Sequence, residues 1–135
     1  MAERTLVIIK PDAVKRKIVG KIISRFEQKG FMIESLQSYL FTRDKAEEFY
    51  SAHSSKPFFS DLVSFITSGP TVAFILDGMN AISTVRFMIG STKSYEAAPG
   101  TIRGDLALNI TDNVIHASDS YESFIKESRV IFDSI

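Results

Sequence analysis

His116 is the residue whose type and position most directly suggest chemistry. It ends a short predicted strand that begins at Asn113, and Ser118-Asp119-Ser120 follows, a combination typical of the start of a helix. A histidine at a strand-to-helix junction is well placed to react, because neutral imidazole is a nucleophile near pH 7. On spacing alone, a core histidine satisfied by Ser118 or by the backbone is the more common arrangement, so both interpretations stay open.

Glu127 borders the apolar stripe of the helix predicted at the end of the chain. It comes three residues after Phe124 and four before Ile131, so its carboxylate lies near the buried side and needs a partner there. His116 is a candidate partner, and a carboxylate would orient its ring. The alternative is a glutamate on the rim of the helix that reaches solvent.

Three separated cations stand where an anionic ligand would explain them. Arg86 falls on the apolar side of a helical pattern, and Lys10 directly follows a buried strand. Arg103 lies in the segment 99–105, whose glycines allow close approach of the backbone. Each could instead be a surface cation with a buried stem. Together with a histidine, they indicate a polyphosphate site.

The glycines form no phosphate-binding loop of a familiar type. Neither G-x-x-x-x-G-K-[ST] nor G-x-G-x-x-G occurs, which argues against a P-loop enzyme, a protein kinase and a Rossmann dinucleotide site. The two histidines lie far apart, and the chain has no cysteine, so the sequence predicts no metal site made by protein ligands. His53, three residues after Tyr50 on one predicted helix face, is interpreted as structural.

Alternating strands and helices must position these residues. The pattern predicts strands over 5–9, 31–41, 71–76 and 113–116. It predicts helices over 14–29, with Gly30 as the C-terminal stop, and over 44–53, 58–66, 80–89 and 121–132. Residues 90–110 are predicted to be a long irregular segment with a functional role, since structureless loops of this length are uncommon. This order favours one sheet covered by helices, and a ferredoxin-like split βαβ arrangement is the natural candidate.

Composition limits the class of protein. The 135 residues fit one domain over 1–135, and 44% hydrophobic residues can form a core. Sixteen basic and sixteen acidic side chains leave no net charge, which disfavours general binding to nucleic acids or membranes. The apolar run from Leu6 to Ile9 is too short for a signal peptide, and Val72 to Leu76 is too short for a membrane helix. We therefore expect a cytoplasmic protein.

Four segments of the chain resemble those of nucleoside diphosphate kinases. They are RTLVIIKPDA at 4–13, SGP at 68–70, PGTIRGD at 99–105 and NVIHASDS at 113–120, in order and over nearly the whole chain. The resemblance implies an α+β, ferredoxin-like βαββαβ sandwich whose four-stranded antiparallel sheet carries added helices. It also implies ping-pong transfer of the γ-phosphoryl group of a nucleoside triphosphate to a nucleoside diphosphate through a phosphohistidine. Mg²⁺ would be bound through the nucleotide phosphates.

The same resemblance assigns roles to individual residues. His116 matches the phosphorylated histidine, and Ser118 and Glu127 match the residues that support it. The residues that match those holding phosphates and ribose are Lys10, Tyr50, Arg86, Thr92, Arg103 and Asn113, of which Lys10 and Tyr50 also count with the catalytic set. Phe58 matches the aromatic that stacks on the base, with Leu62 and Ile110 beside it.

The chain departs from the family pattern where subunits pack. Lys93-Ser94 follows Thr92 where the family usually has Asn-Pro, in a loop that often helps subunits pack. At a different place, Ala117 follows His116 where glycine is frequent, which is a tolerable change. The chain stops at Ile135, short of the tail that some relatives use at subunit contacts. The resemblance implies a homo-oligomer, a hexamer first and a tetramer second.

Two other classes of protein fit the sequence less well. A non-catalytic interaction or regulatory module on the same fold would be favoured by loss of the histidine or the arginines, and all are present. An RNA-binding module would need exposed aromatic residues on the sheet and net positive charge, and neither is evident. Phosphorylation of histidines in other proteins stays open as a side activity.

Overall fold

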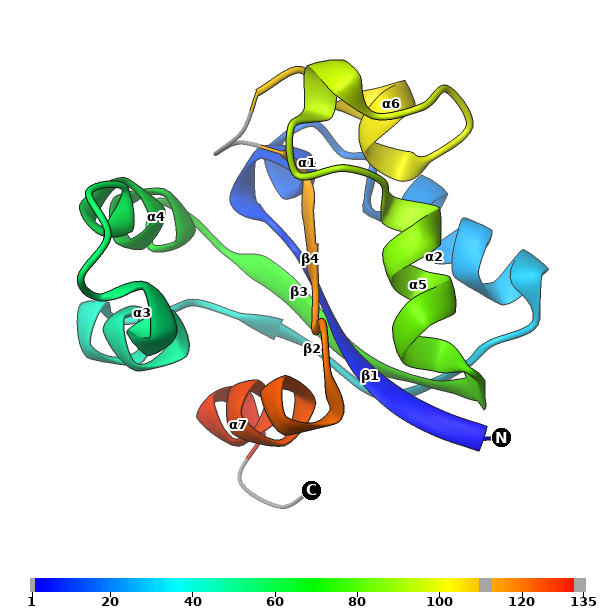
Figure 1. Cartoon of the computed structure of the whole chain (residues 1–135), viewed down its shortest axis with the longest axis horizontal. Helices are drawn as coiled ribbons and strands as arrows, with labels where there is room; N and C mark the ends of the chain where they lie inside the picture. Colours follow the sequence, from blue (N-terminus) through cyan, green and yellow to red (C-terminus); the bar gives the residue numbers. More distant parts are fainter. Residues whose placement is uncertain (1, 110–112, 133–135) are drawn as a thin grey trace.

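One antiparallel sheet organises the molecule. The computed structural model describes residues 2–109 and 113–132, and within them four strands lie in the order β2-β3-β1-β4 (Figure 1). The strands are β1 (Ala2–Ile9), β2 (Met32–Tyr39), β3 (Thr71–Met79) and β4 (Ile115–Ala117). β1 pairs with β3 along its whole length, whereas β4 pairs only with Val7–Ile9. This topology, with helices between the strands, confirms the predicted ferredoxin-like α+β fold.

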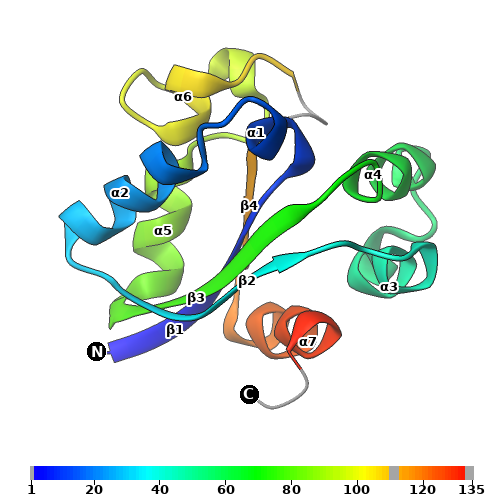
Figure 2. The same ribbon diagram turned by 180° about the vertical axis from the view of Figure 1, so that it is seen from behind.

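Helices cover both faces of the sheet (Figures 1 and 2). The helices on one face are α1 (Pro11–Lys15), α2 (Val19–Lys29), α5 (Ala81–Ile89) and α6 (Ile102–Leu106), and those on the other are α3 (Arg43–Phe49), α4 (Phe59–Ile66) and α7 (Tyr121–Ile131). The alternation of side chains along β1 serves both layers. Val7 and Ile9 are buried in the first core, and Leu6 and Ile8 in the second.

The prediction of one continuous helix over 14–29 is wrong. The chain forms α1 and then α2, and Lys17 between them has a φ of 61°. Pro11 opens α1, where its missing N–H costs no hydrogen bond. The four-residue apolar spacing runs on across the break, so periodicity alone could not reveal it. Gly30 ends α2 in the left-handed conformation, as predicted.

The sequence predicts a long irregular segment over residues 90–110. This prediction is wrong for the described residues 90–109, which contain regular structure. They contain a short 3₁₀-helix, η2 (Ser94–Glu96), and the helix α6. Thr101 caps α6 by accepting a hydrogen bond from Gly104 N at 3.0 Å. A Cβ at residue 104 would collide with the carbonyl oxygen of Ala98, so this turn requires glycine. Both helices are too short to give a periodic apolar pattern.

The remaining elements differ from the predictions mainly at their ends. β3 runs to Met79, and the helix predicted over 44–53 divides into α3 and a 3₁₀-helix, η1 (Ser51–His53). β2 contains an irregularity between Glu34 and Gln37. Ser120 caps α7 through a hydrogen bond from Ser123 N, as its sequence signal predicted. Among the described helices, none is long and apolar enough to cross a membrane.

Candidate active site

His116 occupies the middle of β4, directly opposite Ile8 of β1. Its Nε2 lies 2.9 Å from Oε1 of Glu127 on α7. The ring meets the ring of Phe49 edge to face, with centroids 5.1 Å apart. The side chain keeps 20% of its surface exposed. The imidazole is therefore held from two sides and still reaches solvent.

Glu127 determines which ring nitrogen is available. Its Oε1 also accepts a hydrogen bond from the Ser118 hydroxyl at 2.9 Å. An ionised carboxylate only accepts hydrogen bonds, so Nε2 carries the ring proton and Nδ1 keeps its lone pair. In the described part of the chain, no group hydrogen-bonds to Nδ1. The predicted contact between Glu127 and His116 is present, and Ser118 contacts the carboxylate instead of the ring.

Lys10 and Asn113 form a buried pair beside β4. Lys10 is 5% exposed, and its Nζ donates a hydrogen bond to Asn113 Oδ1 at 2.7 Å. Asn113 Nδ2 donates in turn to the carbonyl of Thr92 at 3.4 Å. Three segments that are distant in the sequence are thereby joined at one end of β1.

Arg103 brings a buried positive charge to the same place. The residue is 3% exposed, and its guanidinium donates to the carbonyls of Gly90, Asn113 and Ile115 at 3.1, 3.4 and 2.7 Å. Within residues 2–109 and 113–132, no carboxylate forms an ion pair with it. Burial, with a smaller contribution from the charge of Arg86, lowers the pKa of Arg103 to about 10. The side chain is still charged near pH 7, and neutral carbonyls leave its charge available to an anion.

Arg86 and Tyr50 lie close to these groups. Arg86 on α5 donates to the carbonyl of Ala117, next to His116, at 3.2 Å. Tyr50 follows α3 and is 7% exposed. Burial and the nearby negative charge of Glu127 raise the pKa of Tyr50 above its ordinary value. Its phenol therefore stays a neutral hydrogen-bond donor at physiological pH.

Phe58 marks the outer side of the candidate site. It precedes α4 and is 44% exposed, and Lys56 Nζ lies 5.7 Å from its ring centroid. Leu62 follows one turn later on α4, where it packs partly buried against the core. Ile110, the third residue predicted on this side, lies outside the described residues.

His53 belongs to this neighbourhood, although the sequence treated it as structural. Its ring lies 5.7 Å from that of Phe58, centroid to centroid, and its buried Nδ1 has no hydrogen-bond partner among the described residues. Burial, then the charge of Lys56, lowers the pKa of His53. His53 ends the 3₁₀-helix η1, and no spacing signal in the sequence indicates its position beside Phe58.

Comparison with known proteins shows the family of this chain. A family model described as "Nucleoside diphosphate kinase" matches residues 3–135. The chain belongs to the nucleoside diphosphate kinase family. It is accordingly an enzyme, a phosphotransferase with the activity of that family.

Relatives of known name match over almost their whole length. The nucleoside diphosphate kinase of Staphylothermus marinus is 61% identical over 130 residues, which cover 96% of this chain and 92% of the relative. That of Thermoplasma acidophilum is 54% identical over 133 residues, with 98% and 90% covered.

Solved structures of nucleoside diphosphate kinases share the fold. The enzyme of Aquifex aeolicus superposes with a TM-score of 0.95 at 47% identity, covering 99% of this chain and 97% of that one. A Halobacterium salinarum enzyme, solved in complex with CDP, gives a TM-score of 0.95 at 41% identity, with 99% and 90% covered.

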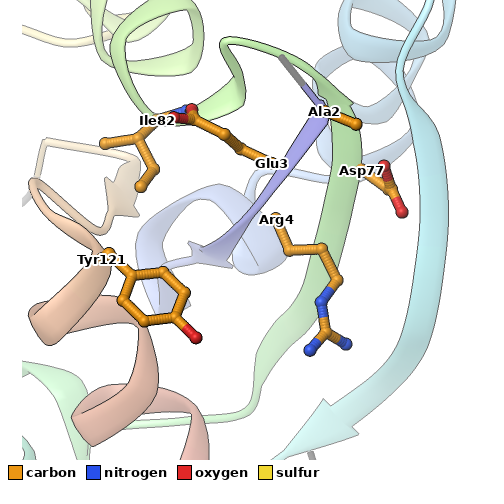
Figure 3. A pocket seen from close by; sticks show the side chains of 6 residues that line it. All are labelled: Ala2, Glu3, Arg4, Asp77, Ile82 and Tyr121. Carbon is orange, nitrogen blue, oxygen red and sulfur yellow. The ribbon is translucent and has the colours of Figure 1, made fainter.

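A separate pocket lies away from the residues expected of a nucleoside diphosphate kinase site. It has a volume of about 490 Å³ and is lined by Ala2, Glu3, Arg4, Asp77, Ile82 and Tyr121 (Figure 3). These residues surround the beginning of β1, whereas His116 pairs near its end. None of the residues predicted to bind nucleotide lines this pocket.

Proposed function

We propose that His116 is the nucleophile through which this enzyme passes a phosphoryl group from a nucleoside triphosphate to a nucleoside diphosphate. The observation that carries the proposal is the Nε2 contact with Glu127, which leaves the lone pair of Nδ1 available. Nδ1 attacks the γ-phosphorus in line. The N–P bond forms while the bond to the bridging oxygen breaks, and the nucleoside diphosphate leaves with the electron pair.

The second half of the reaction reverses the first. The terminal oxygen of another nucleoside diphosphate attacks phosphorus, and the N–P bond breaks to restore Nδ1. While phosphorus is attached, the ring carries positive charge, which Glu127 stabilises through the Nε2–H hydrogen bond. Ser118 holds the carboxylate in place for both halves. This predicts ping-pong kinetics.

We propose that the cations around β4 bind the phosphates. Phosphoryl transfer depends on positioning and on stabilising charge at the equatorial oxygens. The guanidinium of Arg103, which has no carboxylate partner in the described ranges, supports this role. Arg86 and Lys10 complete the positive field. Tyr50, Thr92 and Asn113 supply polar groups to phosphate and ribose.

The exposed ring of Phe58 supports a stacking site for the base. Stacking accepts any base because each presents a π-face, so we expect broad tolerance of the nucleobase. Leu62 and Ile110 would flank the base. The solved relative from Halobacterium salinarum binds CDP, which supports nucleotide binding in this fold. His53, whose Nδ1 is buried beside Phe58, would donate or accept a hydrogen bond toward the nucleotide.

Mg²⁺ is proposed to enter with the nucleotide. Over the described residues, no group of three or more His, Cys, Asp or Glu side chains could hold a metal. The donor set around β4 is cationic and fits phosphates that carry their own Mg²⁺. When bound, the ion would supply charge neutralisation to the phosphoryl group.

The free edge of β2 supports a homo-oligomer. In the described chain β2 pairs only with β3. The exposed fractions of Met32 and Leu36 in β2 are 67% and 53%, and that of Leu40, directly after β2, is 63%. An apolar edge strand of this kind invites pairing with another chain. A hexamer and a tetramer both remain predictions, as does a cytoplasmic location.

We also propose one domain over residues 1–135, because the family match spans nearly all of them.

Labelling tests the proposal. Incubation with γ-³²P-ATP and Mg²⁺ should give an acid-labile, base-stable adduct on the protein. Addition of a nucleoside diphosphate should move the label to nucleotide. His116→Ala should take no label. A wild-type protein that takes no label, or a His116→Ala variant labelled as well as wild type, would contradict the proposal.

A further inference from the structure

The main chain is strained immediately before the proposed nucleophile. Val114 has a φ of 77° although it is β-branched, and it is fully buried. Ile115 N donates a hydrogen bond to Asn113 O at 2.8 Å, which closes a three-residue γ-turn around Val114. A γ-turn with positive φ is rare and strained, and such a conformation persists only where its surroundings impose it.

Two groups from the corner between β1 and α1 hold this turn. The carboxylate of Asp12 accepts a hydrogen bond from Val114 N, with Oδ2 at 3.1 Å. The backbone N–H of Lys10 donates to Val114 O at 2.8 Å. Asp12 stands next to Pro11, whose ring fixes the backbone where α1 begins. The carboxylate is therefore presented to Val114 from a rigid corner.

The turn connects the two halves of the proposed site. Asn113 begins it and receives the hydrogen bond from Lys10 Nζ. His116, the proposed acceptor of the phosphoryl group, lies two residues after Val114 in β4. Arg103 donates to the carbonyls of both Asn113 and Ile115. A change of φ at Val114 would rotate the peptides on both sides and displace His116 relative to Lys10 and Arg103.

We propose that Asp12 is a positioning residue for phosphoryl transfer, because its carboxylate oxygen holds Val114 in the turn that sets His116 against the phosphate-binding cations. This inference rests on the proposed role of His116. Asp12 acts through the main chain, and its required property is a hydrogen-bond acceptor at the position of Oδ2.

Two substitutions at residue 12 separate this role from a general effect of charge. Asp12→Ala removes the acceptor, whereas Asp12→Asn keeps an amide oxygen that can accept from Val114 N. The readout is the rate of His116 phosphorylation in a single turnover at saturating nucleoside triphosphate. We expect Asp12→Ala to lose about 10- to 100-fold, since small misplacements of reacting groups cost this much. Asp12→Asn should stay close to wild type.

A second-site change tests the turn itself. Val114→Gly removes the penalty of positive φ, so it should restore most of the rate that Asp12→Ala loses. Asp44→Ala is the matched control, because Asp44 is likewise a carboxylate in the first turn of a short helix, α3. It should leave the rate unchanged. The amide of Val114, followed by hydrogen exchange, should be protected in wild type and in Asp12→Asn, and exchange faster in Asp12→Ala.

Three results would overturn the inference. They are a wild-type rate in Asp12→Ala, an equal loss in Asp12→Asn and Asp12→Ala, and unchanged protection of the Val114 amide in a slow Asp12→Ala enzyme. Each is distinct from failure of the proposed function, in which the wild-type protein itself forms no phosphohistidine at residue 116.

Discussion

At the scale of single residues, the contact between Glu127 and His116 orients the imidazole and determines which ring nitrogen carries the proton. The carboxylate receives both Nε2–H and the Ser118 hydroxyl. It thereby fixes the tautomer and the plane of the ring. The ring proton and the reactive lone pair then lie on opposite sides of the imidazole.

Replacement of Glu127 should therefore slow transfer while the nucleophile remains. Glu127→Ala removes the acceptor, and we expect a loss of about 10- to 100-fold in the rate of phosphorylation, as for other residues that orient a functional histidine. Glu127→Gln keeps an oxygen for Nε2–H and should lose less. Rapid-quench labelling gives the rates. Equal rates in Glu127→Ala and wild type would show that the contact does not assist the reaction.

At the scale of elements, the site depends on short pieces of structure that carry single residues. The helix α6 spans only Ile102–Leu106 and presents Arg103 to three carbonyls. Its first turn fits because residue 104 has no side chain. The cap from Thr101 and the absence of a Cβ at Gly104 together allow the close approach to Ala98.

Two glycine-to-alanine changes should act in opposite directions. A Cβ at residue 104 meets the Ala98 carbonyl, so Gly104→Ala should lower the free energy of unfolding by about 1–3 kcal/mol. Gly20→Ala in α2 meets no atom within 4 Å and should raise that energy by about 0.5 kcal/mol. Urea unfolding of both variants measures the difference. A stable, fully active Gly104→Ala protein would contradict this account of α6.

Ser94 should be replaceable with a gain in stability. It stands in η2 where the family usually has proline, is 2% exposed, and its Oγ has no hydrogen-bond partner among the described residues. Because a buried unpaired hydroxyl is costly, Ser94→Ala should raise the free energy of unfolding by about 1 kcal/mol.

The neighbouring Ser91 provides the control, since its exposed Oγ accepts a hydrogen bond from Lys93 N. Ser91→Ala should not stabilise the protein. Both variants are compared by chemical unfolding at one protein concentration. A Ser94→Ala protein less stable than wild type would show that the hydroxyl does have a partner.

How far the sequence predicts these elements depends on the kind of signal. Helix ends marked by a residue of characteristic type were predictable, as at Gly30, which ends α2, and at Ser120, whose side chain caps α7. The division of the first helix at Lys17 was not, because the apolar spacing continues through it. In the site, helical spacing placed Glu127 at the border of the buried face and made His116 a candidate partner, and the structure shows that contact. The γ-turn at Val114 could not be predicted from the sequence, because β-branched residues rarely adopt a positive φ.

At the scale of the whole molecule, the sheet gathers residues from distant segments at one end of β1. Lys10, Thr92, Arg103 and Asn113 are connected by hydrogen bonds there, and β4 adds His116. The opposite side of the sheet ends in β2, whose outer edge has no strand partner within the described chain. The proposed catalytic residues and the proposed contact between subunits are thus at different edges.

A charge on the β2 edge should weaken assembly. Leu36→Asp places a carboxylate on a side chain that is 53% exposed in the single chain, and we expect a smaller particle by sedimentation velocity. Met79→Asp, at the end of β3 and 64% exposed, is the control and should keep the wild-type mass. If Leu36→Asp keeps that mass as well, β2 is not the contact.

The central claim is that Nδ1 of His116 carries the phosphoryl group, and nuclear magnetic resonance of the phosphorylated protein tests it most directly. Protein labelled with ¹⁵N in histidine and phosphorylated by ATP should show ³¹P–¹⁵N coupling to Nδ1 of His116, while Nε2 stays protonated. The His116→Ala variant, labelled and treated with ATP in the same way, should show no ³¹P–¹⁵N coupling. Coupling to Nε2, or to His53, would contradict the account.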